Sequence, residues 1–172
     1  SNFIVKTISE LGYTMHAFIL TEEVVPNIVS YKHGESYLAS ILMLIPSQLL
    51  GGYSFASKAA LDTWLQNIHK MPYGPGFSIV AETYYNFGYY GGIIFSIVIG
   101  FLFSKLLNLH TKDKNKNILL RLLSLIFLYN SLILARFPFH NTVRNIVYMY
   151  IVPYWAIIVI YNTIKKRGIK KV

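Results

Sequence analysis

Three long apolar segments constrain the fold of this chain more than any other feature. They run from Gly88 to Leu107, from Ile118 to Ala135 and from Ile146 to Ile164. A helix needs about 20 predominantly apolar residues to cross the ~30 Å hydrocarbon core of a bilayer. The segments therefore predict an all-α integral membrane protein with three transmembrane helices, which short connections make antiparallel neighbours. Pro153 lies within the third segment, where we expect a kink.

The charge of the chain supports a membrane location. Only 13% of the 172 residues are charged, about half the usual share in soluble domains. The net charge is +9, and from residue 88 onward twelve Lys and Arg stand against one Asp. Because this positive charge interrupts apolar runs, it favours a membrane protein over a partner of nucleic acid. The absence of cysteine excludes disulfides, thiolate metal sites and cysteine nucleophiles.

The basic loops predict how the chain is oriented. Lysines are concentrated in residues 108–117, and Lys and Arg dominate residues 165–172. The positive-inside rule places both segments in the cytoplasm, with residues 1–87 and 136–145 outside. We therefore divide the chain into an extracytoplasmic loop region (residues 1–87) and a three-helix transmembrane region with a cytoplasmic basic tail (residues 88–172).

The external region is expected to contain helices that lie on the membrane. Tyr37–Leu50 is apolar but spans only about 21 Å as a helix, which fits an interfacial or re-entrant segment. Ser54–Lys70 has the apolar spacing of an amphipathic helix, with Asp62 and Lys70 facing water. The chain starts at Ser1 without a methionine, so we expect the C-terminal part of a larger polytopic protein and an isolated chain that is inactive.

The run GPGFSIVAETYYNFGYYGG, residues 74–92, contains the first candidate site. Pro75 is expected to open a helix, on which Ser78, Glu82, Tyr85 and Tyr89 share one face. Tyrosine rings that stack on sugars, beside an acid that accepts hydroxyl hydrogen bonds, are typical of a sugar site. The tyrosines also fit an ordinary interfacial aromatic belt. An acid that enters a membrane helix is costly, which favours a function for Glu82.

The run ARFPFHNTVRN contains the second candidate site. Arg136, His140 and Arg144 lie within nine residues, and Asn141 or Thr142 is expected to cap the third span. Arg144 would then lie in the first helical turn, where a cation is unfavourable unless an anion is bound. The arrangement favours a phosphate or pyrophosphate site. Arginines that snorkel to lipid phosphates are the alternative.

The remaining histidines do not indicate a metal site. His16, His33, His69 and His140 are too scattered for ligand spacing such as H-E-x-x-H, so we expect no metal. Nucleophile-elbow, P-loop and dinucleotide motifs are also lacking.

The order of these motifs resembles a known family. ELGYTMHAFILT is followed by VVPNIVSYKHGESYLASILMLIPSQL, then GPGFSIVAETYYNFGYYGG and a basic loop. This order is similar to the C-terminal half of O-antigen polymerases of the Wzy type, which polymerise oligosaccharide repeat units. The resemblance covers nearly the whole chain, and its most specific part is Ala81-Glu82 with Asn86-Phe87-Gly88.

The resemblance implies a membrane glycosyltransferase of the C-type class in the bacterial inner (plasma) membrane. Its substrate would be an oligosaccharide on undecaprenyl diphosphate, and its other partners would be membrane lipids and the chain-length regulator and flippase of the pathway. No cofactor is implied. Arg136 and Arg144 would bind the pyrophosphate, Ser78, Tyr85 and Tyr89 the sugar, and Glu82 or else His140 would serve as the base.

Three alternatives remain at this stage. An O-antigen ligase needs the same pyrophosphate pocket. A non-enzymatic flippase or transporter subunit for lipid-linked sugars needs polar residues along the spans, whereas the ionisable residues here lie at the outer ends and in the cytoplasmic loops. A purely structural membrane subunit predicts that Glu82, Arg136 and Arg144 tolerate substitution.

Overall fold

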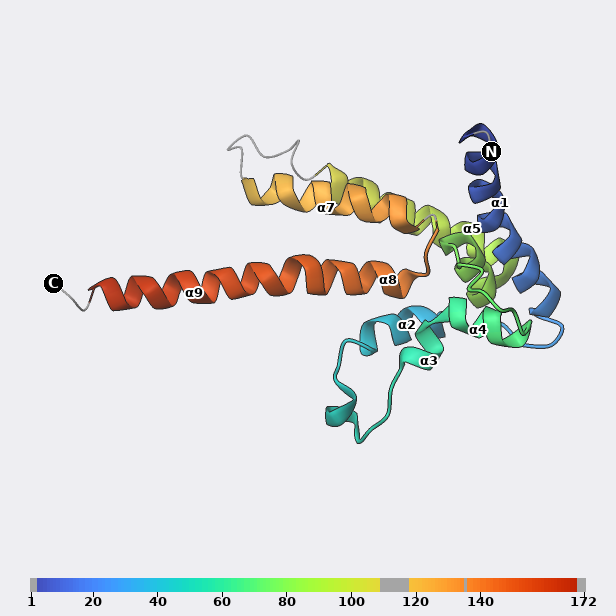
Figure 1. Ribbon diagram of the computed structural model, residues 1–172, viewed down its shortest axis with the longest axis horizontal. Helices are drawn as coiled ribbons and strands as arrows, with labels where there is room; N and C mark the ends of the chain where they lie inside the picture. The colour runs from blue at the N-terminus through green and yellow to red at the C-terminus, as the bar shows by residue number, and fades with distance from the viewer. Residues whose placement is uncertain (1–2, 109–117, 135, 170–172) are drawn as a thin grey trace.

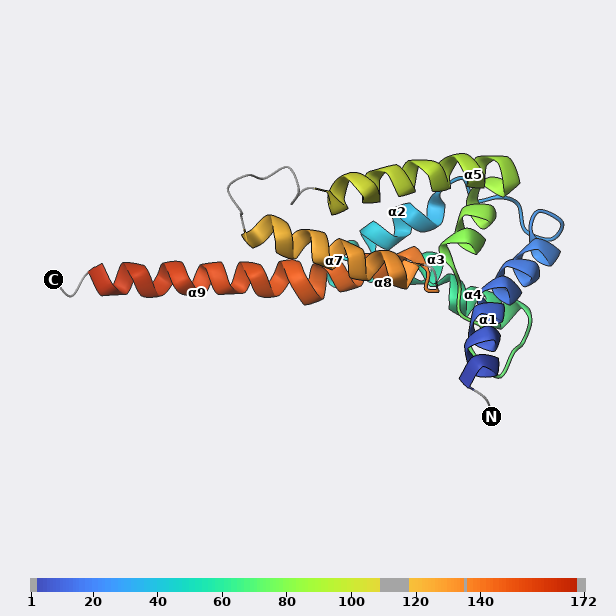
Figure 2. The ribbon, with the colours of Figure 1, turned by 90° about the horizontal axis from the view of Figure 1, so that it is seen from above.

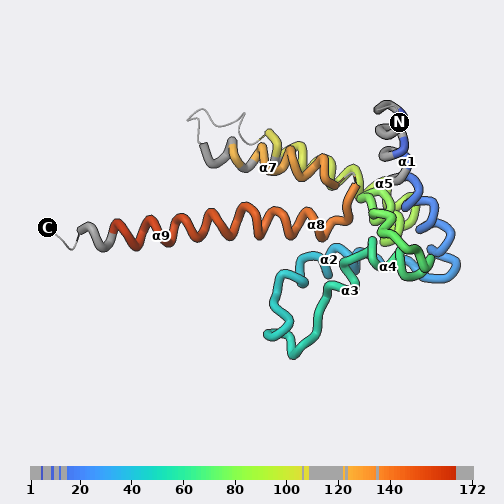
Figure 3. Tube along the Cα trace, viewed as in Figure 1, coloured from blue at the N-terminus to red at the C-terminus, as the bar shows by residue number. Residues whose placement is uncertain are grey.

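The protein is helical throughout the residues that the structure describes. A computed structural model describes residues 3–108, 118–134 and 136–169, and within these ranges the chain forms helices, turns and coil but no strand. The elements in chain order are α1 (Phe3–Val24), α2 (Glu35–Leu42), the 3-10 helix η1 (Ser47–Leu50), α3 (Ala56–Ala59), α4 (Leu61–Ile68), α5 (Ile79–Leu107), α7 (Ile118–Leu134), α8 (Phe139–Arg144), the π-helix η2 (Asn145–Ile151) and α9 (Val152–Ile169). Figures 1 and 3 show α1 to α4 toward one end of the molecule and α7 and α9 extending away from it.

Helix α5 is broken at Gly88 into two limbs. Gly88 has a φ of 69° and a ψ of −168°, a conformation that favours glycine because a Cβ would clash with the backbone. A Cβ at Gly88 would also lie 3.0 Å from the Tyr31 ring. Figure 2 shows the two limbs turned sharply against each other. The first limb therefore packs among α1 to α4, whereas the second limb starts where the first apolar segment was expected to start.

Two helices are long and apolar enough to cross a membrane. Among the described residues these candidates are Ile79–Lys105 and Phe139–Lys165, each of 27 residues. A continuous helix of this length reaches about 40 Å, but the break at Gly88 divides Ile79–Lys105 into two shorter limbs. The expected second span forms α7, whose 17 residues reach only about 26 Å. The structure therefore offers two candidate spans, and the prediction of three is not confirmed. Both views show the second limb of α5, α7 and α9 extending away from the same end of the molecule (Figures 1 and 2).

The third expected span starts earlier and is straighter than the sequence predicts. The helix begins at Phe139 rather than near Ile146 and continues through η2 into α9. The expected kink at Pro153 is wrong, because the wide turns of η2 directly precede the proline and accommodate its missing N–H. The rod shows no sharp bend (Figure 1). The expected external loop 136–145 is correspondingly reduced to a short turn before α8.

The buried core lies between α1, α4 and the first limb of α5. Ala17 and Val24 of α1 pack in one cluster with Leu61 and Leu65 of α4 and with Ala81, together with Val25, Phe77, Tyr84 and Tyr85. Helix α1, which the sequence analysis did not anticipate, thus packs against the candidate sugar segment. The core holds this segment in place from one side.

The external helices are shorter than expected, and most of their apolar positions follow the expected pattern. The segment 37–50 contains most of α2 and all of η1, and Leu38, Ile41, Ile45 and Leu49 along it are exposed. Such an exposed apolar row is consistent with a segment at the membrane surface. The segment 54–70 is divided at Ala60 into α3 and α4, and Ala59, Leu61 and Leu65 are buried as the amphipathic pattern predicts.

Candidate functional site

The Glu82 carboxyl group lies fully buried where α2, the first limb of α5 and the start of α8 meet. Its side chain has an exposed fraction of 0%. Oε1 accepts a hydrogen bond from the Ser36 hydroxyl at 2.7 Å, and Oε2 accepts one from the Phe139 backbone N–H at 2.7 Å. A buried carboxyl group is costly unless it is hydrogen-bonded, and here both oxygens have donors. Glu82 therefore joins three segments that are far apart in the sequence.

Asn86 of α5 and Ser36 of α2 extend this network. The Asn86 amide donates to the Ser36 hydroxyl and to the Glu82 carbonyl, both at 2.8 Å, and its oxygen accepts from the Gly34 N–H at 3.0 Å. Both side chains are buried. The sequence pattern indicates no role for Ser36, and none for Asn86 beyond the family motif. Asn86 lies one helical turn after Glu82, just before the apolar run. A polar residue at this spacing from a buried acid indicates a hydrogen-bond partner, and this signal was present in the sequence.

The break at Gly88 completes the docking of the segment before α2. In a continuous helix the carbonyls of Tyr85 and Asn86 would accept from the following turn. Here they accept instead from the N–H groups of Lys32 and His33, at 3.2 and 2.9 Å. The glycine thus frees backbone acceptors that position the loop leading to Ser36.

Helix α8 begins earlier than the sequence predicts. Pro138 is the residue before the helix and Phe139 the first residue in it, so Asn141 and Thr142 lie inside the helix and cap nothing. Proline suits a helix start because its missing N–H would have had no helical partner. Arg144 therefore lies in the second turn, beyond the first-turn amides, and the Glu82 carboxyl group takes the Phe139 amide. The expected first-turn position of Arg144 is wrong.

His140 follows directly after the residue that Glu82 holds. Its side chain is buried, with 5% exposed, and Nδ1 has no hydrogen-bond partner. The ring interacts with the Ala59 backbone and with the charges of Asp62 and Arg144. Arg144 lies four residues further along the helix and therefore on the same face as His140. The structure thus brings the two sequence-predicted base candidates, Glu82 and His140, into one region.

Two further polar groups lie in this region without a hydrogen-bond partner. Asp62 Oδ1 and the Tyr37 hydroxyl are buried and unpaired. Asp62 interacts electrostatically with both Glu82 and His140, which corrects the expectation that it faces water. Burial and, to a smaller extent, the Glu82 charge raise the pKa of the Tyr37 hydroxyl above its ordinary value. Tyr37 therefore stays protonated and can donate a hydrogen bond.

The expected sugar-binding face is only partly continuous. Ser78 precedes α5, and its hydroxyl accepts from the Ala81 N–H at 3.2 Å, so Ser78 rather than Pro75 starts the helix. Tyr85 is buried and packs against Trp64 with ring centroids 4.7 Å apart. Tyr89 follows the break at Gly88, is half exposed and donates to the Glu22 carboxylate. The prediction that Tyr89 shares the Glu82 face is therefore wrong.

The two arginines of the second candidate site are exposed. Arg136 lies in the turn before α8, and its carbonyl lies beside Gly76, where a Cβ would be 3.7 Å away. The loop after the amphipathic helices is therefore in contact with the turn that carries Arg136. Within the described part of the chain, no three His, Asp or Glu side chains lie close enough to hold a metal ion.

Comparison with known proteins identifies the family. The family model for the O-antigen polysaccharide polymerase Wzy matches residues 1–168, nearly the whole chain. The chain belongs to the Wzy polymerase family. Comparisons with curated proteins and with solved structures give no match.

Family membership confirms the resemblance read from the motifs. Wzy polymerases are membrane proteins that act on lipid-linked oligosaccharides, and the family suggests polymerisation of O-antigen repeat units by a glycosyltransferase-type enzyme. The two apolar helices of this Wzy family member agree with a membrane location.

Proposed function

We propose that this chain polymerises oligosaccharide repeat units carried on undecaprenyl diphosphate into O-antigen or capsule-type polysaccharide. The reaction takes place at the outer face of the bacterial plasma membrane, with residues 1–87 and the turn before α8 outside. Family membership supports repeat-unit polymerisation. The observation that carries the proposal is the hydrogen bond between Glu82 and the Phe139 N–H, because it holds the expected sugar segment against the expected pyrophosphate segment.

The reaction joins two lipid-linked glycans. A hydroxyl oxygen of the incoming repeat unit attacks the anomeric carbon of the growing glycan, and the bond from that carbon to the phosphate oxygen breaks. The hydroxyl proton goes to a base, and undecaprenyl diphosphate leaves with the bonding electron pair. The site therefore has to supply one proton acceptor and cations that stabilise the charge on the leaving group.

His140 is the proton acceptor in this proposal. Its Nδ1 has no hydrogen-bond partner, whereas both oxygens of Glu82 already accept hydrogen bonds. Glu82 is therefore a positioning residue, which fixes the start of α8 and with it the direction of the His140 ring. From the sequence, Glu82 was the first candidate for the base and His140 the second; the proposal reverses this order. A positioned general base is worth about 10²–10⁴-fold in rate.

Arg136 and Arg144 bind the diphosphate of the leaving group. Both side chains are exposed on the turn and helix that carry His140, and the charge of Arg144 acts on the His140 ring. Arginine suits this role because its planar guanidinium donates two parallel hydrogen bonds to phosphate oxygens. The exposed side of α8 is thus where the diphosphate approaches.

The proposal is tested in a strain that lacks the gene for the full-length protein. We expect the surface polysaccharide ladder to collapse to a single repeat unit on a gel and to return with the wild-type gene. His140→Asn should fail to restore the ladder, because asparagine keeps a polar group near Nδ1 but accepts no proton. His33→Asn is the matched control, since His33 is exposed and its left-handed backbone conformation suits asparagine.

The same gel separates the alternative functions. A full-length polymer stranded on its lipid carrier would indicate a ligase. Precursor that accumulates at the cytoplasmic face would indicate a flippase. An unchanged ladder, in a strain without a second polymerase, would contradict the proposal.

A further inference from the structure

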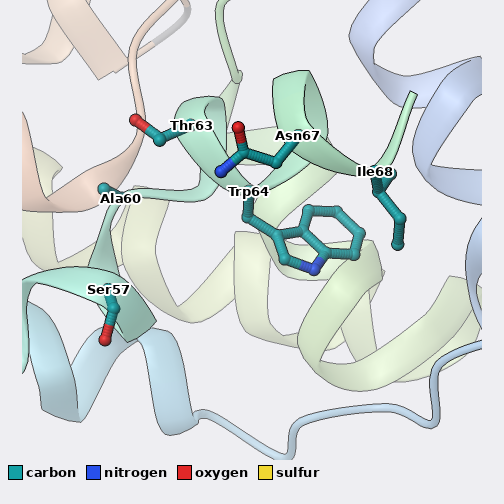
Figure 4. A pocket seen from close by; sticks show the side chains of 6 residues that line it. All are labelled: Ser57, Ala60, Thr63, Trp64, Asn67 and Ile68. Carbon is teal, nitrogen blue, oxygen red and sulfur yellow. The ribbon is translucent and has the colours of Figure 1, made fainter. Parts of the chain in front are cut away.

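A pocket lies on the external helices α3 and α4. Its volume is about 400 Å³, which falls within the ~300–1,000 Å³ of typical ligand pockets. The lining residues are Ser57, Ala60, Thr63, Trp64, Asn67 and Ile68. Figure 4 shows these side chains around the pocket, with the indole of Trp64 on one side. None of them belongs to the site around Glu82.

The pocket offers one aromatic ring and several neutral polar groups. Ser57 and Thr63 supply hydroxyls, Asn67 supplies an amide, and none of the six lining residues is ionisable. A phosphate or carboxylate would find no cation among these residues. A sugar ring fits this chemistry, because its C–H face stacks on an indole while its hydroxyls exchange hydrogen bonds with hydroxyl and amide groups.

Trp64 is held in place from the core side. Its ring meets Tyr85 edge to face at 4.7 Å and Phe77 at 6.3 Å between centroids. Both partners are buried. A ring fixed in this way loses little freedom when a ligand binds, which favours affinity. The buried Tyr85, expected from the sequence to bind sugar itself, supports the Trp64 ring.

The pocket adjoins the region of His140. Ala60 follows Ala59, whose backbone interacts with the His140 ring. Thr63 follows Asp62, whose charge acts on both His140 and Glu82. Two lining residues of the pocket are thus direct chain neighbours of groups that interact with the proposed base. A glycan seated in the pocket would be held on the segment that carries these groups.

We propose that this pocket is a binding subsite for an uncharged sugar ring of the acceptor glycan. The inference rests on the proposed polymerase function and adds the place where the acceptor is held. It predicts that a soluble oligosaccharide without its lipid diphosphate binds to the protein, because the pocket contacts only the sugar.

The test measures binding of oligosaccharides released by mild acid from the strain's own surface polysaccharide. Titration calorimetry on the full-length protein in lipid nanodiscs gives the affinity. We expect Asn67→Ala and Thr63→Val, both at exposed positions, to weaken binding about three- to tenfold. Trp64→Ala should weaken it more than tenfold, and Trp64→Phe should retain most of the affinity because it keeps an aromatic face. Gln48→Ala, an exposed polar residue outside the pocket, is the matched control.

Two results would overturn the subsite. Affinities of the Asn67, Thr63 and Trp64 variants equal to that of Gln48→Ala would show that the pocket does not hold the sugar. Equal binding of inorganic pyrophosphate and oligosaccharide, both abolished by Asn67→Ala, would show that the pocket does not select neutral sugars. Either result leaves polymerisation intact if the deletion strain still loses its ladder, whereas an unchanged ladder removes the proposed function itself.

Discussion

Replacing Glu82 tests whether its carboxyl group fixes the start of α8. Glu82→Ala removes the acceptor of two buried donors, the Ser36 hydroxyl and the Phe139 N–H. Glu82→Gln keeps an amide oxygen for the Phe139 N–H but places an NH₂ group against Ser36. The Ser36 oxygen already accepts from Asn86, so the hydroxyl hydrogen of Ser36 loses its acceptor.

The structure sets the relative magnitude of the two effects. A buried donor without an acceptor costs about 1–3 kcal/mol. Glu82→Ala leaves two such donors and should lower the free energy of unfolding by about 2–6 kcal/mol. Glu82→Gln leaves one and should lower it by about half as much. Glu23→Ala, at an exposed acidic position of α1, should change it by less than about 0.5 kcal/mol.

The assay is thermal denaturation of the full-length protein in detergent, together with the polysaccharide ladder of strains that carry each variant. We expect the melting temperature to fall in the order control, Gln and Ala. We expect Glu82→Gln to retain a shortened ladder, because the Phe139 N–H keeps its acceptor and His140 keeps its place. Glu82→Ala should lose the ladder.

A double substitution gives the sharpest refutation. Ser36→Ala removes the acceptor of the Asn86 amide in any background, but in the Glu82→Ala background it no longer breaks the bond to Glu82, so it should cost less there than in the wild type. An equal loss in both backgrounds would show that Ser36 and Glu82 do not interact. A Glu82→Gln strain without any ladder, at normal protein level and stability, would show that the carboxylate itself is the base and refute the positioning role.

Two further predictions concern the helix break and the diphosphate. Gly88→Ala should destabilise the protein by about 1–3 kcal/mol in thermal denaturation, because alanine at a φ of 69° is strained and its Cβ would meet the Tyr31 ring at 3.0 Å. Gly100→Ala is the control, since it has no neighbour within 4 Å, and an equal loss there would contradict the account. Arg144→Ala should shorten the polymer sharply on the gel while Arg144→Lys retains part of it. Polymer of normal length would remove Arg144 from the site.

The apolar helices could be predicted from the sequence because apolar length is a local property. The first apolar segment was placed from Gly88 onward, and the chain indeed turns at that residue. The same glycine was not recognised as a break, so Tyr89 was assigned to the face of Glu82. A left-handed conformation depends on tertiary contacts such as that with Tyr31, which periodicity does not reveal.

The candidate site was predictable in part for a similar reason. Glu82 and His140 stand out as ionisable groups at the ends of apolar runs, and the structure places them in one region. The hydrogen bond that connects them, from the Phe139 N–H to Glu82, joins residues 57 positions apart, so local spacing could not predict it. No sequence pattern distinguishes Ser36 from the other serines, because its importance comes from its contact with the buried Glu82. The start of α8 was predictable, since a proline such as Pro138 commonly stands at a helix start. From the sequence, the start was instead expected at Asn141 or Thr142, which are common capping residues.

The most direct test of the account is polymerisation by the purified full-length protein. Undecaprenyl-diphosphate-linked repeat units and the protein in nanodiscs are combined, and the products are separated on a gel. We predict a ladder of successive repeat units with release of undecaprenyl diphosphate, present with wild type and with His33→Asn and absent with His140→Asn. Unchanged precursor with the wild-type protein, or an equal ladder with His140→Asn, would contradict it.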